Sequence, residues 1–302
     1  MYEILSMSST AKDINNLTYT DYFYRLMLMA RSVFKWEGLP NGIDEKWIEK
    51  YLFAEGQCMF FHDEKLGFMV AKTAMNGQLN YYDEPTNIMP YATNHNFENR
   101  TYHNFMGRKG AGEFPEAVLI RNNDMMLPTA PTIRLYALRL TDIARTIDVN
   151  INAQKTPSFI KCSEKQRLTL KNVFRQWTGN EPVIFGDKDM SDTPIQSIST
   201  EAPIVFDKLQ IQKHAIWNEA MTFLGINNAN MDKRERLVDD EVQANNEQIE
   251  LSASVMLKSR EKACELINKL FPECNVSVSL RNREEMEQMY QEEKKGELAN
   301  VC

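Results

Sequence analysis

The stretch that decides the fold runs from Asn122 to Pro157 and reads NNDMMLPTAPTIRLYALRLTDIARTIDVNINAQKTP. Pro128 and Pro131 suit a helix start, because the first turn of a helix donates no intrahelical N–H bonds. Apolar residues then recur at helical spacing until Pro157 ends the segment: Ile133, Tyr136, Leu140, Ile143, Ile147 and Ile151. The pattern predicts a helix from Pro131 to Gln154, roughly 36 Å long at 1.5 Å per residue.

A second stretch, APIVFDKLQIQKHAIWNEAMTFLGI, predicts another long helix that begins near Pro203. Gly225 is a good residue for the position just after its C-terminus. Between the two helices lies a mixed, strand-like insert from Ser158 to Thr200, whose clearest strand is EPVIFGD. Long helices gain little from intrinsic propensity and need packing partners along their length, so we expect neighbouring copies of the chain to supply them.

The rest of the chain predicts a mixed α+β fold. DYFYRLMLMARSVFKWEGLP is interpreted as a first helix, capped by Thr20 or Asp21 and stopped at Gly38. DEKWIEKYLFAEG is interpreted as a short second helix. Aromatic and β-branched runs between Gln57 and Ile120 alternate with Gly, Asn and Pro, which predicts a small β unit.

A polar stretch from Asn227 to Glu250, NNANMDKRERLVDDEVQANNEQIE, follows the second long helix. Long irregular loops inside a domain are uncommon and are usually functional or disordered, so we interpret it as a functional loop. Helical spacing returns from about Asn246 to Phe271, with Arg260 interrupting the apolar stripe. The charged end of the chain, from Arg281 onward, is interpreted as a frayed helix or a tail.

Composition restricts the possible functions. The chain has 302 residues, 43% hydrophobic and 25% charged, as in ordinary soluble proteins, and it has no apolar run long enough for a membrane span. Its net charge of -7 does not favour nucleic-acid binding over the whole surface but allows local basic patches. The five scattered cysteines indicate reduced thiols in a cytosolic compartment.

Motifs for catalysis, cofactors or metals are absent from the sequence. GRKGAG, from Gly107 to Gly112, lacks the Lys-Ser/Thr ending of a phosphate-binding loop. An acidic cluster at Asp239, Asp240 and Glu241 leaves open a metal-dependent nuclease as a rival interpretation, although adjacent residues rarely converge on one ion. We expect no enzyme activity, no cofactor and no metal.

Six stretches, in their order and spacing, carry a resemblance to a known family: VFKWEGLP, LIRNNDMMLPTAPT, NINAQKTP, GNEPVIF, WNEAMTFLGINNAN and DEVQANNEQIE. The chain resembles the upper collar protein (head–tail connector, or portal) of small podoviruses of the Bacillus type, from about Phe34 to Lys269. The resemblance implies a ring of about twelve copies at one capsid vertex. Double-stranded DNA would be packaged and ejected through its channel, and the ring would join head to tail.

The resemblance also implies a division of the chain. Residues 1–126 would form a wing containing an SH3-like β unit, residues 127–157 and 203–226 two stem helices, and residues 158–202 a clip. Residues 227–247 would form a channel loop, 248–271 a wing helix and 272–302 the crown and C-terminal tail. Stem packing is expected from Ile133, Leu140, Ile143, Ile147, Leu209, Ile216 and Phe223.

By the same resemblance, Lys208 would line the stem, and Lys233, Arg234 and Arg236 lie in the expected channel loop. Sparse basic bands suit a duplex that must slide, because a uniformly basic tube would trap DNA through its phosphates. The family has a further basic residue before the second stem helix, where this chain has Ser199-Thr200-Glu201. One basic band is therefore absent from that position.

The implied partners are other copies of the chain, non-specific double-stranded DNA, the major capsid and scaffold proteins, a packaging ATPase and the lower collar. The expected location is the virion, after assembly in the host cytoplasm. The family's basic N-terminus, associated with a packaging RNA, is nearly neutral here, with only Lys12 in MYEILSMSSTAKD. Clip residues are the alternative RNA or motor contact, unless they form a solvated face: Lys161, Lys165, Arg167, Lys171 and Arg175. Another head–tail adaptor ring, without a DNA-retaining role, is the rival interpretation.

Overall fold

The computed structural model describes most of the chain in two compact units. The described residues are 11–77, 79–92, 97, 100–108, 114–154, 158–161, 183–186, 195–197, 205–227 and 239–281. One unit comprises residues 1–19 and 138–216, and the other comprises residues 20–137 and 217–302. We call them the smaller and the larger unit. The fold is mixed α+β, as the sequence predicts.

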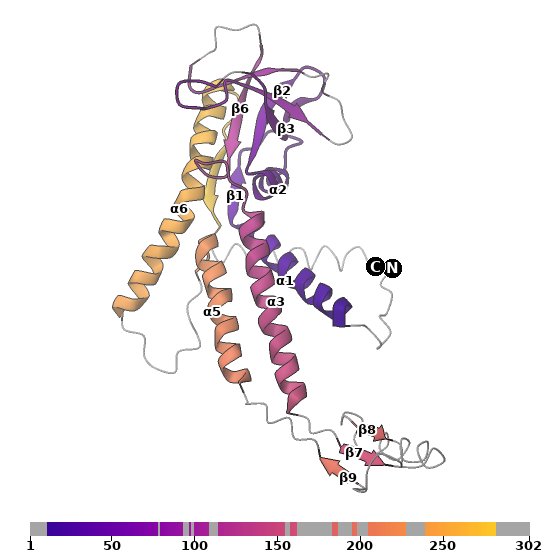
Figure 1. The fold of residues 1–302 in the computed structure, drawn as a ribbon. Coiled ribbons are helices and arrows are strands. Elements are labelled where there is room, and N and C mark those ends of the chain that lie inside the picture. Colours follow the sequence, from indigo (N-terminus) through magenta and orange to yellow (C-terminus); the bar gives the residue numbers. More distant parts are fainter. Residues whose placement is uncertain are drawn as a thin grey trace, which may run out of the picture. The chain divides into compact units, whose positions relative to one another are not determined.

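The larger unit contains a closed β-barrel, visible in Figure 1. Its five strands are β2 (Gln57–Asp63), β3 (Gly67–Met75), β4 (Asn87–Tyr91), β5 (Tyr102–Asn104) and β6 (Glu116–Arg121). β2 pairs antiparallel with both β3 and β6, and the parallel β5–β6 pair closes the barrel. Its interior is apolar and includes Met59, Phe61 and Tyr102. The small β unit predicted between Gln57 and Ile120 is thereby confirmed.

Helix α2 (Glu45–Glu55) precedes the barrel and matches the predicted short helix. Its N-cap, Asp44, accepts a hydrogen bond from the backbone N–H of Lys46 at 2.9 Å. This bond satisfies one of the donors that a helix leaves unpaired at its start. At the other end Gly56 adopts φ 79° and its N–H donates to the carbonyl of Leu52.

The N-terminal prediction was wrong at both ends of the first helix. Helix α1 runs from Ala11 to Ser32, so Thr20 and Asp21 lie inside it. Thr18 is compatible with a helix interior because its hydroxyl donates to the carbonyl of Ile14 at 2.8 Å. The expected continuation to Gly38 is instead strand β1 (Phe34–Glu37).

Strand β1 exists because a distant segment pairs with it. β10 (Ser277–Leu280) forms a two-stranded antiparallel sheet with β1, in which Phe34 faces Leu280 and Glu37 faces Ser277. The aromatic residues of β1 favour a strand once a partner is present. The segment from 272 to 302, expected to form the crown and C-terminal tail, therefore contains a strand.

The two long helices are confirmed, with bounds close to those expected. α3 runs from Ala130 to Ala153 and α5 from Phe206 to Leu224. Gly225 follows α5 with φ 75°, and the N–H of Ile226 donates to the carbonyl of Met221 at 2.9 Å. These features agree with the predicted glycine C-terminus.

The insert between the long helices contains three short strands: β7 (Ser158–Lys161), β8 (Val183–Gly186) and β9 (Ile195–Ser197). They form one sheet in the order β8–β7–β9, with a parallel β7–β8 pair and an antiparallel β7–β9 pair. β8 coincides with the strand expected in EPVIFGD.

The last helix starts earlier than expected. α6 runs from Asp239 to Leu270, so the final part of the predicted 227–247 loop is helical. Asp239, Asp240 and Glu241, which the sequence offered as an acidic cluster, belong to the first turn of this helix. α6 lies along the barrel beside β6 (Figure 1).

Candidate interaction surfaces

The smaller unit exposes apolar side chains that a stable isolated chain would be expected to bury. Val149 on α3 is 64% exposed and Ile211 on α5 is 67% exposed. Leu17, Leu138, Ile151 and Phe206 are exposed as well. Among the side chains described in this unit, Leu140 is the one buried apolar residue. Helices with so little core of their own provide faces for association with other copies.

The expected stem-packing residues differ in burial. Ile133 and Leu140 on α3 are fully buried. Ile143 and Ile147 on α3 are partly buried, as are Leu209, Ile216 and Phe223 on α5. The first two thus already pack within one chain, whereas the other five keep part of their surface for further contacts.

In each unit a hydrogen bond joins α3 to α5 or to the residue just before α5. In the larger unit, the Tyr136 hydroxyl donates to Glu219 at 3.2 Å, and the Tyr136 and Phe223 ring centroids lie 6.2 Å apart. In the smaller unit, the backbone N–H of Val205 donates to the Asn150 side chain at 3.2 Å. The two long helices are therefore linked near both ends of the pair.

The basic residues expected to contact DNA are only partly within the described chain. Lys208 is exposed in the first turn of α5. Lys233, Arg234 and Arg236 lie outside the described residues. Lys161 belongs to β7, and the other four expected clip contacts, Lys165, Arg167, Lys171 and Arg175, lie outside the described residues.

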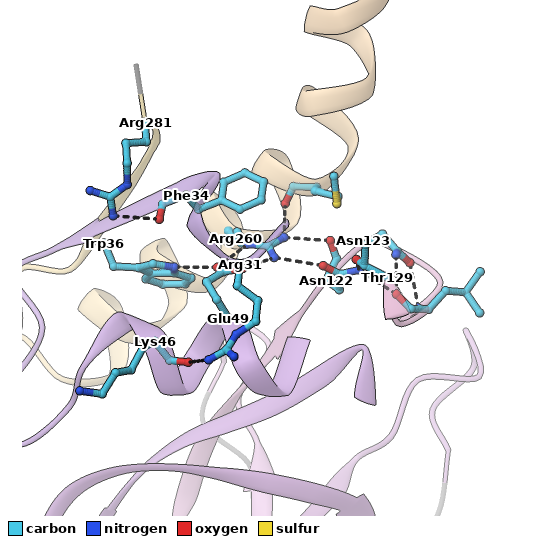
Figure 2. Close-up of polar contacts among 12 residues, drawn as sticks. Arg31, Phe34, Trp36, Lys46, Glu49, Asn122, Asn123, Thr129, Arg260 and Arg281 are labelled. Atoms are coloured by element: carbon cyan, nitrogen blue, oxygen red, sulfur yellow. Dashed lines mark hydrogen bonds and ion pairs between the residues drawn. The ribbon is translucent and has the colours of Figure 1, made fainter. Parts of the chain in front are cut away.

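A buried polar cluster in the larger unit centres on Arg260 of α6 (Figure 2). Its guanidinium donates to both carboxylate oxygens of Glu49 on α2, at 2.9 and 2.8 Å. It also donates to the backbone carbonyl and the side-chain oxygen of Asn122, at 3.1 and 3.0 Å. The Phe34 ring centroid lies 3.9 Å from the Arg260 Cζ atom, and the Trp36 indole N–H donates to Glu49 at 2.9 Å. Arg260 therefore joins β1, α2, α6 and the segment after β6.

The turn between β6 and α3 is also fixed by hydrogen bonds. The Asn122 amide donates to the Leu127 carbonyl at 2.8 Å and to the Thr129 hydroxyl at 3.0 Å. The Asn123 side-chain oxygen accepts from the N–H groups of Met125 and Leu127. The start of the long helix is thereby held against the barrel and the Arg260 cluster.

Sequence reasoning missed the Arg260–Glu49 pair. A signal was present, because Arg260 interrupts an apolar stripe at helical spacing and a charge at such a position needs a buried partner. The partner could not be named, because Glu49 lies far away in the sequence on a helix whose other charged residues are exposed or only partly buried.

The described part of the chain offers no metal site and no membrane helix. No three His, Cys, Asp or Glu side chains gather there in a way that could hold an ion. No helix there combines the length and apolarity that a membrane crossing requires. Burial raises the pKa of the Cys58 thiol and raises that of Cys264 to about 12, so both thiols remain protonated at neutral pH.

Comparison with known proteins gave a similar solved structure and a matching family model. The chain is similar over nearly its full length to a chain of the solved structure "Portal and tail of native bacteriophage P68". The identity is 14%, the TM-score is 0.47, and the match covers 98% of this chain and 99% of that one. A model of the Phage Connector (GP10) family matches residues 3–286. The chain therefore belongs to the Phage Connector (GP10) family, whose members are structural portal proteins of bacteriophages rather than enzymes.

Proposed function

We propose that the chain assembles into a closed ring at one capsid vertex, through which double-stranded DNA is packaged and ejected, and which joins head to tail. The helices α3 and α5 form the stem of this ring, and the insert between them, residues 158–202, forms the clip. The number of copies is about twelve, and the contact between neighbours is heterologous, so the ring closes by rotation.

The observation that carries the proposal is the exposed apolar surface of the smaller unit. Val149 and Ile211 are each more than half exposed, and this unit has almost no apolar core among its described side chains. Burying apolar surface is worth about 25 cal/mol per Å², so repeated contacts of this kind around a ring are a large driving force. Membership of the connector family is consistent with the same assembly.

In this proposal the channel wall carries few positive charges. Lys208 forms one basic band on the stem, and Lys233 and Arg234, with Arg236 nearby, form another from the segment after α5. With a net charge of -7 per chain, the rest of the ring repels DNA on balance. Phosphate contacts confined to narrow bands hold the duplex without preventing it from sliding.

The ring itself performs no ATP-driven work. A separate packaging ATPase binds at the clip, where Lys161, Lys165, Arg167, Lys171 and Arg175 are the candidate contacts for the motor or a packaging RNA. The wing contacts the major capsid and scaffold proteins, and the lower collar joins the portal to the tail.

Native mass spectrometry of the purified protein, with negative-stain imaging, tests the assembly. A closed ring near twelve copies with a central hole is the expected result. Where the chain alone remains monomeric, the measurement is repeated with scaffold protein, and a monomer that persists under both conditions contradicts the proposal.

The rival function is a head–tail adaptor ring that does not retain DNA. Changing Lys233 and Arg234 together to alanine separates the two. A portal variant of this kind assembles normally but releases packaged DNA, measured as nuclease-accessible genome in filled heads. A matched change of Lys258 and Lys262, both exposed on α6, to alanine should leave retention unchanged. Equal retention in both variants would favour the adaptor.

A further inference from the structure

The outward face of α2 carries a tryptophan between two lysines. Trp47 is 43% exposed. The ammonium nitrogens of Lys46 and Lys50 lie 5.2 and 5.3 Å from its ring centroid. Such contacts between a cation and an aromatic ring are favourable but weak at an exposed site, so they do not by themselves neutralise either charge.

A second contact of this kind lies near the C-terminal end of α2. Lys72 of β3 lies 5.9 Å from the ring centroid of Tyr91 on β4, and its ammonium pairs with Glu55 at 2.9 Å. Lys46 pairs with Asp44 at 2.7 Å. Among the described carboxylates, none forms an ion pair with Lys50. We call Lys46, Trp47 and Lys50 the α2 platform.

The C-terminal segment leaves the described structure beside this platform. β10 pairs with β1, and the N–H of Arg281 extends that pairing by donating to the Val33 carbonyl at 2.8 Å. The Arg281 guanidinium then pairs with Glu45, in the first turn of α2, at 2.5 Å. The last described residue of the chain thus contacts the residue next to Lys46 through its side chain.

The residues that follow complement the platform in charge and polarity. Residues 282–302 read NREEMEQMYQEEKKGELANVC. Glu284, Glu285 and Glu287 alternate with Met286, and Met289 and Tyr290 come next. Nine residues can span up to about 30 Å, whereas Glu45 and Lys50 are separated by only about 8 Å along the helix axis.

We propose that the acidic, methionine-rich segment from Glu284 to Tyr290 docks on the α2 platform of its own chain. Its carboxylates approach Lys46 and Lys50. A methionine or tyrosine side chain covers the exposed Trp47 ring, because contacts of sulfur or of a second aromatic ring with an aromatic ring are favourable. Tethering at Arg281 makes the contact intramolecular, with an effective concentration of about millimolar, so weak individual contacts suffice.

Zero-length carbodiimide coupling, which joins a lysine amine to a carboxylate with loss of water, tests the contact. Unlabelled and ¹⁵N-labelled full-length protein are mixed, coupled and digested for mass spectrometry. We expect peptides that join Lys46 or Lys50 to Glu284, Glu285 or Glu287, both halves carrying the same label. Coupling of these glutamates to other lysines only, or to none, overturns the proposal. Mixed-label peptides also overturn it, because a neighbouring copy would then be the occupant.

Charge reversal provides a second test. A glutamate-specific protease should cut residues 282–302 of the Lys46→Glu/Lys50→Glu variant faster than it cuts the same residues of the unmodified protein. The expected increase in cleavage rate is roughly fivefold or less for each lysine reversed. The Lys258→Glu/Lys262→Glu variant makes the same charge change on an exposed face of α6. The protease should cut its residues 282–302 at the same rate as in the unmodified protein. Equal rates in the two variants would contradict docking on α2.

Discussion

The Arg260 guanidinium and the Glu49 carboxylate are each almost fully buried, with side chains 2% and 3% exposed. Their geometry is bidentate, and the Trp36 indole and the Asn122 oxygens satisfy further hydrogen-bonding groups around them. A buried ion pair of this kind need not add much stability over an apolar pair, but removing one partner strands the other charge.

The Arg260→Met variant should therefore lose about 3–5 kcal/mol of unfolding free energy, because Glu49 is left buried and uncompensated. Urea denaturation followed by tryptophan fluorescence measures the loss. The Arg260→Met/Glu49→Gln double variant keeps an acceptor for the Trp36 indole without a stranded charge, so it should be more stable than the single variant. A single variant within about 1 kcal/mol of the unmodified protein would contradict the role given to the pair.

Asp63, at the end of β2, gives a prediction with a definite pH dependence. The Lys65 N–H donates to its carboxylate at 2.8 Å and the Leu66 N–H at 3.1 Å, and Arg100 lies 3.1 Å from the other oxygen. These contacts, the Lys65 hydrogen bond first, lower the pKa of Asp63 below the ordinary 3.8. A lowered pKa contributes stability above the unfolded-state value, and this stability is lost as pH falls through the folded-state value.

Asp63→Asn should thus cost about 1–2 kcal/mol at pH 7, where the charged hydrogen bonds and the Arg100 pair are present. The difference from the unmodified protein should shrink as pH falls below about 4. Denaturation curves measured between pH 3 and 7 check this, with Glu261→Gln at an exposed position of α6 as the control. A difference that stays constant with pH would mean that the Asp63 charge does not contribute.

At the scale of elements, the C-terminus of α2 and the turn before α3 approach each other at Gly56. A Cβ atom on Gly56 would lie 2.1 Å from the Met126 carbonyl oxygen, and the residue has φ 79°. Gly42 has φ 93° but nothing within 4 Å of such an atom. Gly56→Ala should lower the unfolding free energy by about 2–4 kcal/mol and Gly42→Ala by about 1–2 kcal/mol. The larger loss at Gly56 would come from the clash with the Met126 carbonyl. Thermal unfolding of both variants measures it, and equal costs would show that α2 and the turn do not need this close approach.

Elements with a complete local signal were predictable from sequence. The long helices α3 and α5 combine proline starts with apolar residues at helical spacing, and α2 carries both an Asp44 cap and a Gly56 end. β1 was missed because Val33 and Phe34 also fit the apolar face of the preceding helix. Only the pairing with β10, more than two hundred residues later, makes the segment a strand.

The candidate sites were less accessible to sequence reasoning than the fold. Periodicity identified the apolar faces of α3 and α5, because repeated spacing on one helix is a local property. It could not distinguish Ile133, which is buried within one chain, from Ile151 in the same predicted stripe, which is exposed. The basic residues proposed for the channel remain predictions, since Lys208 is exposed and Lys233 and Arg234 lie outside the described residues.

At the scale of the whole molecule, the proposed ring requires the exposed apolar faces of the smaller unit to be buried by neighbouring chains. The Val149→Asp/Ile211→Asp variant places two carboxylates on these faces. Because both positions are exposed in the single chain, unfolding free energy should change by only about 0.5 kcal/mol for each substitution. In a ring the same carboxylates would be buried without partners, so assembly should be lost.

Native mass spectrometry and negative-stain imaging distinguish these outcomes, with circular dichroism to confirm that the variant chain is folded. The Leu66→Asp/Tyr81→Asp variant makes the same kind of change at exposed positions of the larger unit, on β-turns of the barrel, and should still form rings. Normal rings from Val149→Asp/Ile211→Asp would show that neighbouring chains do not cover these faces. Loss of rings in both variants would point instead to a general effect of added charge on association. Loss in the first alone would identify the stem helices as the surface that closes the ring.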